Sequence, residues 1–338
     1  MPISQSISLK PYNSFGIDVK ARYFAAFQSL DTLQALLYET RLPIQKRLVL
    51  GGGSNVLFTT DYDGLVLRNE IPGISVEEAD SDAYFVRVGA GVNWHAFVMD
   101  CIRTNRSGVE NLSLIPGSVG ASPIQNIGAY GVEVQEVIHK VEAWHINDRV
   151  LVQFDRKACG FGYRESVFKH QFRNQFVITH VTFRLPRYPV YHTTYGAIQQ
   201  QLAGMQVTEL SIAAIAQAVI HIRTSKLPDP RILGNAGSFF KNPVVTAQTH
   251  MQLQQQFPNL VSYIQADGTY KLAAGWLIEQ CGWKGYRKGD AGCHENQALV
   301  LVNYGAARGS EIWELSQEIA ASVKARFGVQ LEPEVNCI

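Results

Sequence analysis

The stretch Gly51-Gly52-Gly53-Ser54-Asn55 decides how the first half of the chain is interpreted, because it follows directly on the apolar segment 47–50. A glycine-rich turn after a strand presents backbone N–H groups that can form a nest for phosphate oxygens. It is not a G-x-G-x-x-G fingerprint, since Val56 takes the sixth position and a new strand is expected from Gly64. It is not a P-loop either, because no Gly-Lys-Ser/Thr follows. The alternative is a simple turn, although three consecutive glycines are costly in conformational entropy.

A second glycine-rich segment runs from Pro116 to Gly131 and alternates small residues with polar ones. We expect extended backbone here, of a kind that can lie against a flat ring and a pyrophosphate. Either segment alone is weak support for a cofactor site. Two of them in one strand-rich half predict a dinucleotide that is bound without a Rossmann fold.

Composition places the chain among globular proteins with ample core. It has 338 residues, of which 46% are hydrophobic and 17% are charged, a length that suggests two or three domains. The net charge is +1 and no Lys/Arg run is present, so nucleic-acid binding is not expected. No apolar run reaches the length of a membrane span. The segment Met1–Gln5 has neither a basic nor an apolar region, so we expect no signal peptide.

The five cysteines are odd in number and scattered, without a C-x-x-C pair. They predict reduced thiols in a cytoplasmic protein rather than a disulfide framework. Cys293-His294 is an adjacent pair of possible ligands, but no further ligand lies nearby in the sequence, so no metal is expected.

Hydrophobic periodicity predicts many strands and few helices before residue 190, and more helices after it. The expected helices are 29–38, 93–102, 210–222, 246–257, 272–281 and 310–327, the last of them started by Ser310 with Glu311 and Glu314 near its positive end. The expected strands are 47–50, 64–67, 84–88, 176–185, 297–302 and 330–337, with a hairpin over 141–154 that turns at Asn147-Asp148.

The segment Gly234–Pro243 is the strongest candidate for chemistry. It sets Ser238 between a glycine and two phenylalanines, with Lys241 and Asn242 just behind. Glycine permits close approach to the backbone, and the phenylalanines can exclude water. One interpretation is a site that delivers one proton in a dry pocket. The other is a strand end with a buried serine, and these ten residues alone favour neither.

Several motifs together are similar to a known family. They are Asn13-Ser14-Phe15-Gly16, Gly51 to Leu57, Ile115 to Gly131, Gly162-Tyr163-Arg164-Glu165-Ser166, Thr194-Tyr195-Gly196, Arg223 to Asn242, and Leu331 to Val335. Over essentially its whole length the chain resembles the UDP-N-acetylenolpyruvoylglucosamine reductases, flavoenzymes that make UDP-N-acetylmuramate for peptidoglycan. The segment around Tyr195 resembles the substrate-covering tyrosine loop of the family's first class.

The resemblance implies an α+β protein with an FAD-binding fold of the vanillyl-alcohol-oxidase (PCMH) type and a smaller α/β substrate domain. The implied ranges are 1–70 and 71–205 for two FAD-binding subdomains and 206–338 for the substrate domain, whose last strand returns to the active site. It also implies non-covalent FAD and NADPH as co-substrate. A hydride passes from NADPH to flavin N5 and then to the enolpyruvyl CH2 carbon, and the carbon next to the carboxylate is protonated.

By the same resemblance, Ser238 is the proton donor, Arg164 binds the substrate carboxylate and Glu334 is the essential carboxylate. A serine hydroxyl is a poor acid, so Ser238 needs neighbours that ease proton loss. An arginine fork can bind two carboxylate oxygens, although a surface arginine is the alternative for Arg164. A bare anion beside a developing enolate opposes the reaction, so we expect burial to raise the pKa of Glu334 until it is protonated or strongly hydrogen-bonded.

Glu332 is the competing carboxylate, expected two residues from Glu334 on the same face of an edge strand that contains Pro333. The resemblance assigns further residues to ligands. Those for FAD are Gly51, Gly52, Gly53, Ser54, Asn55, Pro116, Gly117, Ser118, Gly120, Ala121, Asn126, Gly128 and Tyr130. Those for the UDP-sugar are Tyr195, Lys226, Asn242, Tyr263, Lys284 and Gln297. Two positions depart from the family pattern: Asn336 stands where relatives carry arginine, and Cys293 where valine is usual.

Three other functions compete with this interpretation. A flavin oxidase of the same fold leaves Ser238 and Glu334 unexplained. A serine hydrolase lacks its G-x-S-x-G elbow, because Ala236 and Phe240 occupy the glycine positions. A non-catalytic nucleotide-sugar binding module is expected to be colourless. The expected partners are small molecules alone, with no nucleic acid and no membrane, and the expected state is a cytoplasmic monomer.

Overall fold

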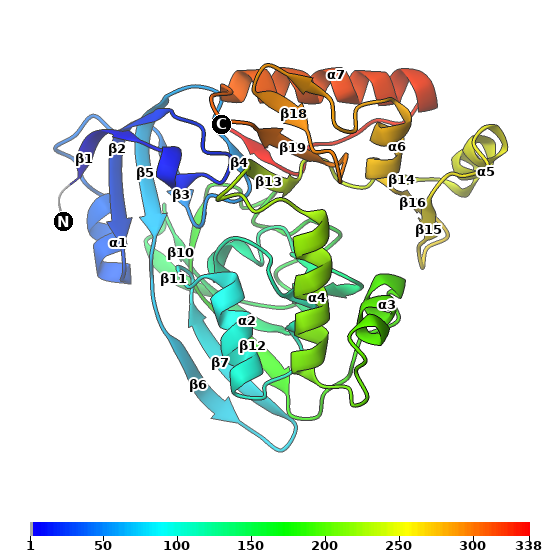
Figure 1. Cartoon of the computed structure of the whole chain (residues 1–338). Helices are drawn as coiled ribbons and strands as arrows, with labels where there is room; N and C mark the ends of the chain where they lie inside the picture. Colours follow the sequence, from blue (N-terminus) through cyan, green and yellow to red (C-terminus); the bar gives the residue numbers. More distant parts are fainter. Residues whose placement is uncertain (1–2) are drawn as a thin grey trace. The chain divides into compact units, whose positions relative to one another are not determined.

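The computed structural model describes residues 3–338 and divides into two compact units, each built from several segments of the chain (Figure 1). Within the described residues, unit 1 comprises 3–7, Ala21–Gly53 and Asp63–Ser225. Unit 2 comprises Ser8–Lys20, Ser54–Tyr62 and Lys226–Ile338. The expectation of no signal peptide rests partly on Met1 and Pro2, which lie outside the described residues. No helix within residues 3–338 is both long enough and apolar enough to cross a membrane.

The first sheet of unit 1 has the strand order β1-β2-β5-β3 and packs against helix α1. Its elements are β1 (Ser4–Ser8), β2 (Lys20–Phe27), α1 (Leu30–Leu37), β3 (Arg47–Leu50) and β5 (Tyr62–Asn69). Burial alternates along the first half of β2, because side chains in a strand alternate between the two faces, whereas β5 is buried on both faces over residues 64–67. The expected helix is confirmed, and Ser29 caps it by accepting from the N–H of Thr32 at 3.2 Å.

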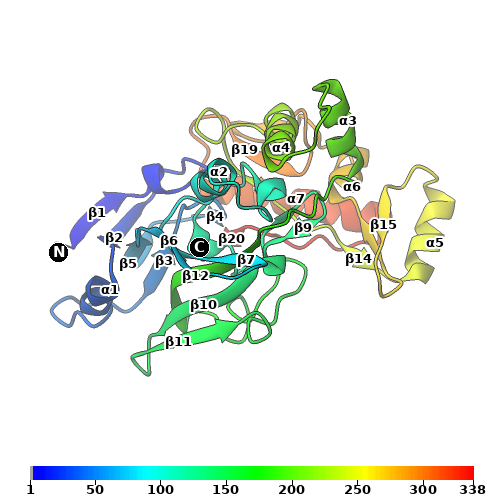
Figure 2. The same cartoon turned by 90° about the horizontal axis from the view of Figure 1, so that it is seen from below.

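The second sheet of unit 1 is antiparallel, with the order β11-β10-β12-β7-β6 (Figure 2). Its strands are β6 (Ile74–Ala79), β7 (Ala83–Gly89), β10 (Ile138–His145), β11 (Val150–Asp155) and β12 (Phe176–Pro186). The expected hairpin over 141–154 is confirmed by the β10–β11 pairing, in which His145 faces Val150. Helix α2 (Trp94–Arg103), capped by Asn93, covers the sheet, and its Phe97 packs on Phe183 of β12 with ring centroids 4.7 Å apart.

A buried ion pair lies in the middle of this sheet. Glu142 of β10 is 5% exposed and accepts two hydrogen bonds from the guanidinium of Arg87, at 2.7 and 3.1 Å. Burial by itself raises the pKa of the Glu142 carboxyl. The hydrogen bonds and charge of Arg87, together with the charges of His180 and Lys140, lower this pKa by more, so the net shift is downward. A carboxyl whose pKa is lowered by folding adds stability above its unfolded pKa, and that stability is lost as the pH falls through the folded value.

Replacing Glu142 with glutamine is therefore expected to destabilise the protein by about 2 kcal/mol at pH 7, because it removes the charged hydrogen bonds of Arg87 to its buried partner and leaves the guanidinium with Glu77 at 3.4 Å. The difference from the parent protein shrinks as the pH falls below the ordinary pKa of a glutamate, about 4.3, toward the lowered pKa of Glu142 in the folded protein. Urea unfolding measured from pH 7 down to pH 3 checks this. Glu78→Gln, at an exposed site on β6, is the control and leaves stability unchanged. Equal losses for Glu142→Gln at every pH contradict the account.

Helices α3 and α4 complete unit 1. Helix α4 (Ile212–Lys226) was expected from its apolar periodicity, and Ile215, Val219 and Ile222 are buried. Helix α3 (Gly196–Gly204) was not expected, since its first turn follows a glycine and its surface is rich in glutamine. Its buried Ile198 lies in the same cluster as the buried residues of α4.

The main sheet of unit 2 has the order β13-β19-β18-β17 and packs against helix α7 (Figure 1). These elements are β13 (Gly234–Ser238), β17 (Arg287–Lys288), β18 (Ala291–Cys293), β19 (Val300–Asn303) and α7 (Gly309–Phe327). A smaller sheet, β14-β16-β15, is built from β14 (Val244–Val245), β15 (Ser262–Ile264) and β16 (Tyr270–Leu272), with helices α5 (Ala247–Gln256) and α6 (Ala274–Gln280) nearby in the chain. Strand β4 (Val56–Leu57) pairs in parallel with β20 (Asn336–Cys337).

Three expectations for unit 2 are corrected by the structure. Helix α7 begins after Arg308, not at Ser310, because Glu311 accepts from the N–H of Arg308 at 2.7 Å and closes a capping box there. The strand expected at 297–302 begins only at Val300, whose N–H donates to Gln297 across a turn. The strand expected at 330–337 is reduced to Asn336–Cys337, and Pro333, which has no N–H for a ladder, makes only an isolated bridge.

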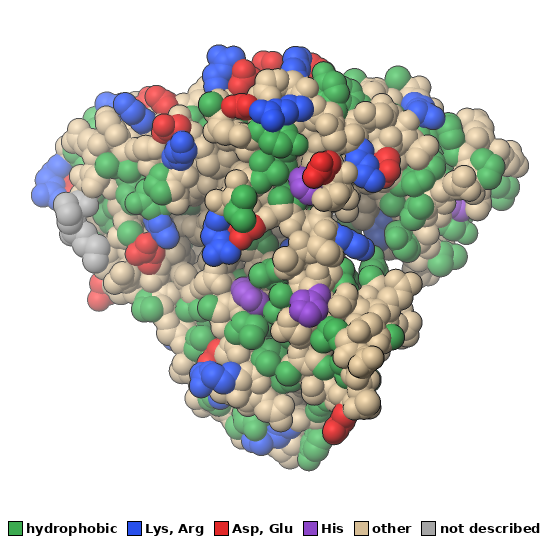
Figure 3. All heavy atoms as spheres, in the orientation of Figure 1, with side chains coloured by type: hydrophobic (Ala, Val, Ile, Leu, Met, Phe, Trp, Pro, Cys, Tyr) green, Lys and Arg blue, Asp and Glu red, His purple; other side chains and the backbone are tan. Residues whose placement is uncertain are grey.

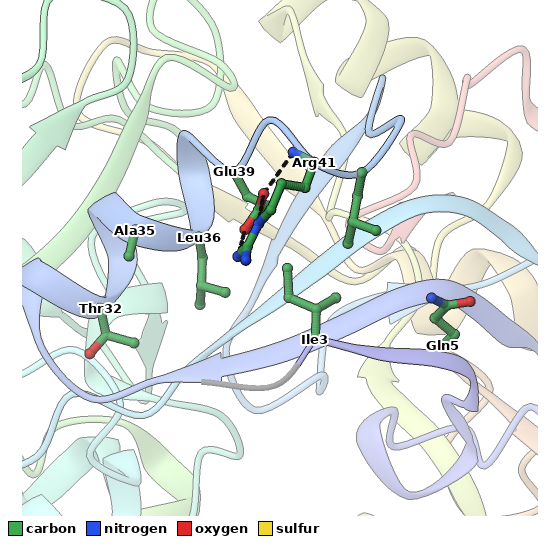
Figure 4. A pocket seen from close by; sticks show the side chains of 8 residues that line it. Ile3, Gln5, Thr32, Ala35, Leu36, Glu39 and Arg41 are labelled. Atoms are coloured by element: carbon green, nitrogen blue, oxygen red, sulfur yellow. Dashed lines mark hydrogen bonds and ion pairs between the residues drawn. The ribbon is translucent and has the colours of Figure 1, made fainter.

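Two surface features complete the description. Lys, Arg, Asp and Glu side chains are interspersed over α7 on the face shown in Figure 3. A hollow of about 550 Å³ opens between β1 and α1 in unit 1, and its one cation, Arg41, is already paired with Glu39 (Figure 4). No residue that the sequence assigned to a site lines this hollow, whose walls are Ile3, Gln5, Thr32, Ala35, Leu36, Glu39, Arg41 and Leu42.

Candidate active site

The two glycine-rich segments predicted from the sequence lie against each other in unit 1. A Cβ atom on Gly51 would stand 2.4 Å from Ser118 Oγ, and one on Gly52 would stand 2.8 Å from Gly117 Cα. Glycine is required at Gly52, where a side chain would meet backbone atoms, whereas at Gly51 the Ser118 hydroxyl would have to rotate away. Within residues 3–338, the N–H groups of Gly52 and Gly53 donate to no backbone carbonyl. The loop therefore retains N–H groups of the kind that hold a pyrophosphate, which fits a dinucleotide.

Gly52→Ala is expected to lower the free energy of unfolding by about 1–3 kcal/mol, because the new methyl group meets the backbone of Gly117 and Ser118. The purified variant should also retain less FAD. Urea unfolding and the absorbance of released flavin measure the two effects. Gly204→Ala at the end of α3 is the matched control, since a Cβ there meets nothing within 4 Å. Unchanged stability and flavin content in Gly52→Ala contradict this assignment.

The second glycine segment is not extended throughout, which corrects the sequence expectation. Val119–Ala121 forms a 3-10 turn, because the N–H groups of Val119 and Gly120 donate to Val92 and Ala90, at 2.8 and 2.9 Å, rather than running on as a strand. A Cβ on Gly120 would lie 2.5 Å from the Ala90 side chain. The segment is thus held tightly against the end of β7.

Asn126 and Arg164 hold the far end of the same segment. Asn126 has a φ of 45°, and its amide donates to Glu133 Oε2 at 2.8 Å and to the carbonyl of Gly162 at 3.0 Å. Arg164, with a φ of 57°, donates to the carbonyl of Gly128 at 2.7 Å. Both side chains therefore order the loop that was assigned to the cofactor, and Arg164 is not a loose surface arginine.

Tyr130 and Tyr195 meet edge to face, with ring centroids 5.5 Å apart and an interplanar angle of 87°. Tyr130 lies in the second glycine segment. Tyr195 immediately precedes α3 and is 44% exposed. The contact joins the segment that resembles a tyrosine loop to the segment assigned to FAD, and both belong to unit 1.

Ser238 and Glu334 are brought side by side in unit 2. Strand β13 ends at Ser238, and the N–H of Glu334 donates to the carbonyl of the next residue, Phe239, at 2.8 Å. The N–H of Lys241 donates to the carbonyl of Glu332 at 2.9 Å, so the two segments run antiparallel. Phe239 is fully buried, and the Ser238 and Glu334 side chains are partly buried. The backbone at Ser238 and Phe239 therefore runs beside the backbone at Glu334.

The structure separates Glu334 from the competing Glu332. The Glu332 side chain is 71% exposed and lies 3.8 Å from Lys241 Nζ. The expectation that the two share one face of a strand is wrong, because Pro333 interrupts the strand between them. The backbone of Glu334 is also held by Asn55, whose amide donates to its carbonyl at 3.2 Å. Asn55, assigned to FAD from the sequence, therefore also positions the Glu334 segment.

Two asparagines that sequence reasoning missed fix the segment before Ser238. Asn235 donates to the carbonyls of Pro228 and Leu233 at 3.1 and 2.8 Å, and accepts from the N–H of Gly237 at 2.9 Å. Asn303 of β19 donates to the carbonyl of Phe15 at 2.9 Å. The sequence signal for Asn235 was the Asn-Ala-Gly motif, because an asparagine side chain often accepts a hydrogen bond from the backbone N–H two residues further on.

The residues assigned to the UDP-sugar are only partly brought together. Asn242 accepts from the N–H of Ala274 at 2.9 Å, at the start of α6, and Gln297 Oε1 lies 2.9 Å from where a Cβ on Gly275 would stand. Lys284 pairs instead with Glu279 near the other end of α6. Lys226 is exposed at the end of α4, and Tyr263 is 47% exposed on β15.

Comparison with known proteins decides the family. A UDP-N-acetylenolpyruvoylglucosamine reductase of Amoebophilus asiaticus is 49% identical over 338 residues and covers 100% of both chains. One of Pseudomonas putida is 50% identical over 335 residues, or 98% of each chain. The chain belongs to the UDP-N-acetylenolpyruvoylglucosamine reductase family. It is an oxidoreductase of this type.

The two halves of the reductase match separate family models. Residues 21–152 match an FAD binding domain, and residues 229–338 match the C-terminal domain of UDP-N-acetylenolpyruvoylglucosamine reductase. A crystal structure of UDP-N-acetylenolpyruvylglucosamine reductase from Thermus caldophilus has the same fold, with a TM-score of 0.68 at 23% identity, covering 100% of this chain and 99% of that one. The expected α+β fold, an FAD-binding domain with a second domain, is confirmed.

The two departures from the family pattern are accommodated locally in this reductase. Cys293 is buried, which raises the pKa of its thiol to about 12, and its Sγ donates to the carbonyl of Ala298 at 2.9 Å. Asn336 donates through its amide to the carbonyl of Asn55 at 3.0 Å. Asn336 thus reinforces the pairing of β4 with β20 beside the Glu334 segment. All five cysteines are free thiols.

Proposed function

We propose that this reductase uses NADPH and non-covalently bound FAD to reduce UDP-N-acetyl-3-O-(1-carboxyvinyl)-glucosamine to UDP-N-acetylmuramate. The observation that carries the proposal is the backbone hydrogen bond from Glu334 to Phe239, which sets Ser238 and Glu334 side by side in the domain that defines the family. The chemistry that FAD supplies when bound is hydride transfer, from NADPH to N5 and onward to the enolpyruvyl methylene carbon.

The protein must manage the negative charge that hydride addition creates on the α-carbon and its carboxylate. Arg164 is proposed to bind that carboxylate through its guanidinium fork, which its bond to the carbonyl of Gly128 orients. Ser238 is proposed to give its hydroxyl proton to the α-carbon, and water later restores the proton. Glu334 is proposed to donate a hydrogen bond that stabilises the developing charge. Buried Phe239 and Phe240 keep the environment dry, which strengthens these interactions.

The glycine segments are proposed to hold FAD. The supporting observations are the close approach of Gly51 and Gly52 to the second segment and the N–H groups of Gly52 and Gly53, which donate to no backbone carbonyl in the described residues. The residues assigned to the cofactor are Gly51, Gly52, Gly53, Ser54, Asn55, Pro116, Gly117, Ser118, Gly120, Ala121, Asn126, Gly128 and Tyr130. Those assigned to the UDP-sugar are Tyr195, Lys226, Asn242, Tyr263, Lys284 and Gln297.

Membership of the family's first class is also proposed. Its support is the packing of Tyr195 on Tyr130, which gives the tyrosine loop a docking point. We further propose the domain ranges 1–70, 71–205 and 206–338, and a monomeric protein of the cytoplasm. Five free thiols are typical of proteins from a reducing compartment.

Steady-state turnover tests the proposal. NADPH oxidation should be fast only when the enolpyruvyl UDP-sugar is present, and the product should be UDP-N-acetylmuramate. Oxidation of an alcohol with oxygen as acceptor would instead indicate a flavin oxidase. Labelling of Ser238 by hydrolase probes would indicate a serine hydrolase, and a colourless purified protein would indicate a binding module. Any of these three results contradicts the proposal.

A further inference from the structure

The segment 188–194, which leads from the end of β12 to Tyr195, is hydrogen-bonded to the rest of unit 1 at a single point. Within residues 3–338, the carbonyl of His192 is the only backbone group of this segment that forms a hydrogen bond, and its donor is the side-chain amide of Asn111, at 2.8 Å. Tyr188 in the same segment is 75% exposed. The path of the chain just before Tyr195 therefore depends on Asn111.

The same amide also reaches the second glycine segment. It donates to the carbonyl of Tyr130, at 3.4 Å. Tyr130 has a φ of 52°, in the left-handed region, which is unfavourable for a tyrosine and persists only where the surroundings hold it. The ring of Tyr130 is also the one that Tyr195 meets edge to face. Asn111 thus binds the backbone of both segments close to the point where their aromatic side chains touch.

Asn111 is itself held firmly. It is 2% exposed and lies in the 3-10 turn Glu110–Leu112. The indole N–H of Trp94 in α2 donates to the carbonyl of Leu112 at 2.9 Å, and the hydroxyl of Ser113 donates to a carbonyl of the same turn at 2.7 Å. A side chain whose own backbone is fixed in this way can set the position of the groups that it binds.

We propose that Asn111 is a positioning residue, which holds the segment before Tyr195 against the segment assigned to FAD. The proposal rests on the proposed function, in which Tyr195 contacts the UDP-sugar. A loop that is ordered in advance loses less conformational entropy when its ligand binds. Asn111 is assigned to neither ligand, so its removal should weaken binding of the UDP-sugar without slowing the chemical steps.

Cleavage by chymotrypsin after Tyr191 measures the attachment in the FAD-loaded protein, without NADPH or the UDP-sugar. Asn111→Leu lacks the donor and releases the carbonyl of His192, so this cleavage should be at least tenfold faster. The same variant should raise the KM for the UDP-sugar about tenfold, while kcat and FAD content stay within about twofold of the parent protein. Asn69→Leu on β5 is the matched control. Asn69 is also buried in unit 1 and donates to the carbonyl of Ile178 at 2.9 Å, so its loss should lower stability without either change.

A parental rate of cleavage after Tyr191 in Asn111→Leu overturns the proposal. Faster cleavage with an unchanged KM overturns it too, because the attachment then does not serve the substrate site. A fall in kcat or a loss of FAD indicates general damage and also overturns it. If Asn111→Leu does not fold, Asn111→Ala replaces it under the same criteria. Failure of the parent protein to reduce the UDP-sugar defeats the proposed function, whereas the cleavage rate still decides whether Asn111 holds the segment, so the two failures are distinguishable.

Discussion

Ser238→Ala is expected to slow reoxidation of the reduced flavin by the enolpyruvyl UDP-sugar about a thousandfold, the scale of loss when a positioned proton donor is removed. The hydroxyl is absent, and the neighbouring Phe239 and Phe240 are buried and apolar, so water is a poor substitute. Reduction of the flavin by NADPH does not use this proton and should keep its rate. Anaerobic stopped-flow absorbance measures each half-reaction separately.

Ser310→Ala in the first turn of α7 is the matched control for Ser238→Ala and should react at the parental rate. Ser238→Cys retains an ionisable proton and should recover part of the lost rate. Equal slowing of both half-reactions by Ser238→Ala indicates a damaged site rather than a missing proton donor. A parental rate of reoxidation contradicts the assigned role of Ser238.

Glu334→Gln is expected to slow the same reoxidation step about a hundredfold, because it replaces the acidic O–H donor at a developing oxyanion with an amide N–H of much lower acidity. The glutamine fits the same space and keeps the backbone bond to Phe239, so substrate binding should change little. The loss should therefore fall on the rate at saturating substrate and not on the apparent affinity. Single-turnover reoxidation over a range of substrate concentrations separates the two.

Glu332→Gln is the control that the chain itself offers for Glu334→Gln. Glu332 lies two residues away, but its side chain is 71% exposed and directed to Lys241. Its replacement should leave both half-reactions within twofold of the parental rates, because an exposed pair of this kind contributes little. A Glu334→Gln protein that retains the full hydride-transfer rate contradicts the acid role of Glu334.

Local sequence signals were enough to predict α1, α2 and α4 to α7 and several strands, but other strands, such as β2 and β6, were missed. The apolar spacing and the Ser29 cap predicted α1, and the Asn147-Asp148 turn predicted the β10–β11 hairpin. The errors arose where two local signals competed. Ser310 is a better capping residue than Arg308, yet the chain begins α7 at Gly309, where a Cβ would stand 1.8 Å from the carbonyl oxygen of Phe58. That contact joins residues far apart in the sequence, and no local rule reveals it.

In the candidate site, too, local patterns could be predicted from the sequence, but contacts between distant residues could not. Glycine is informative in sequence, so the loops of Gly51 and Gly117 were predicted, although not that they touch. The partnership of Ser238 with Glu334 came from the family resemblance and not from spacing. The hydrogen bond from Asn303 to the carbonyl of Phe15 could not be predicted, since it joins residues far apart in the sequence.

The most direct test of the central claim is an anaerobic experiment on the parent protein in two additions. NADPH should bleach the flavin absorbance, and the enolpyruvyl UDP-sugar, added next without oxygen, should restore it with formation of one UDP-N-acetylmuramate per flavin. A flavin that NADPH fails to bleach, or that stays bleached after the UDP-sugar is added, contradicts the account.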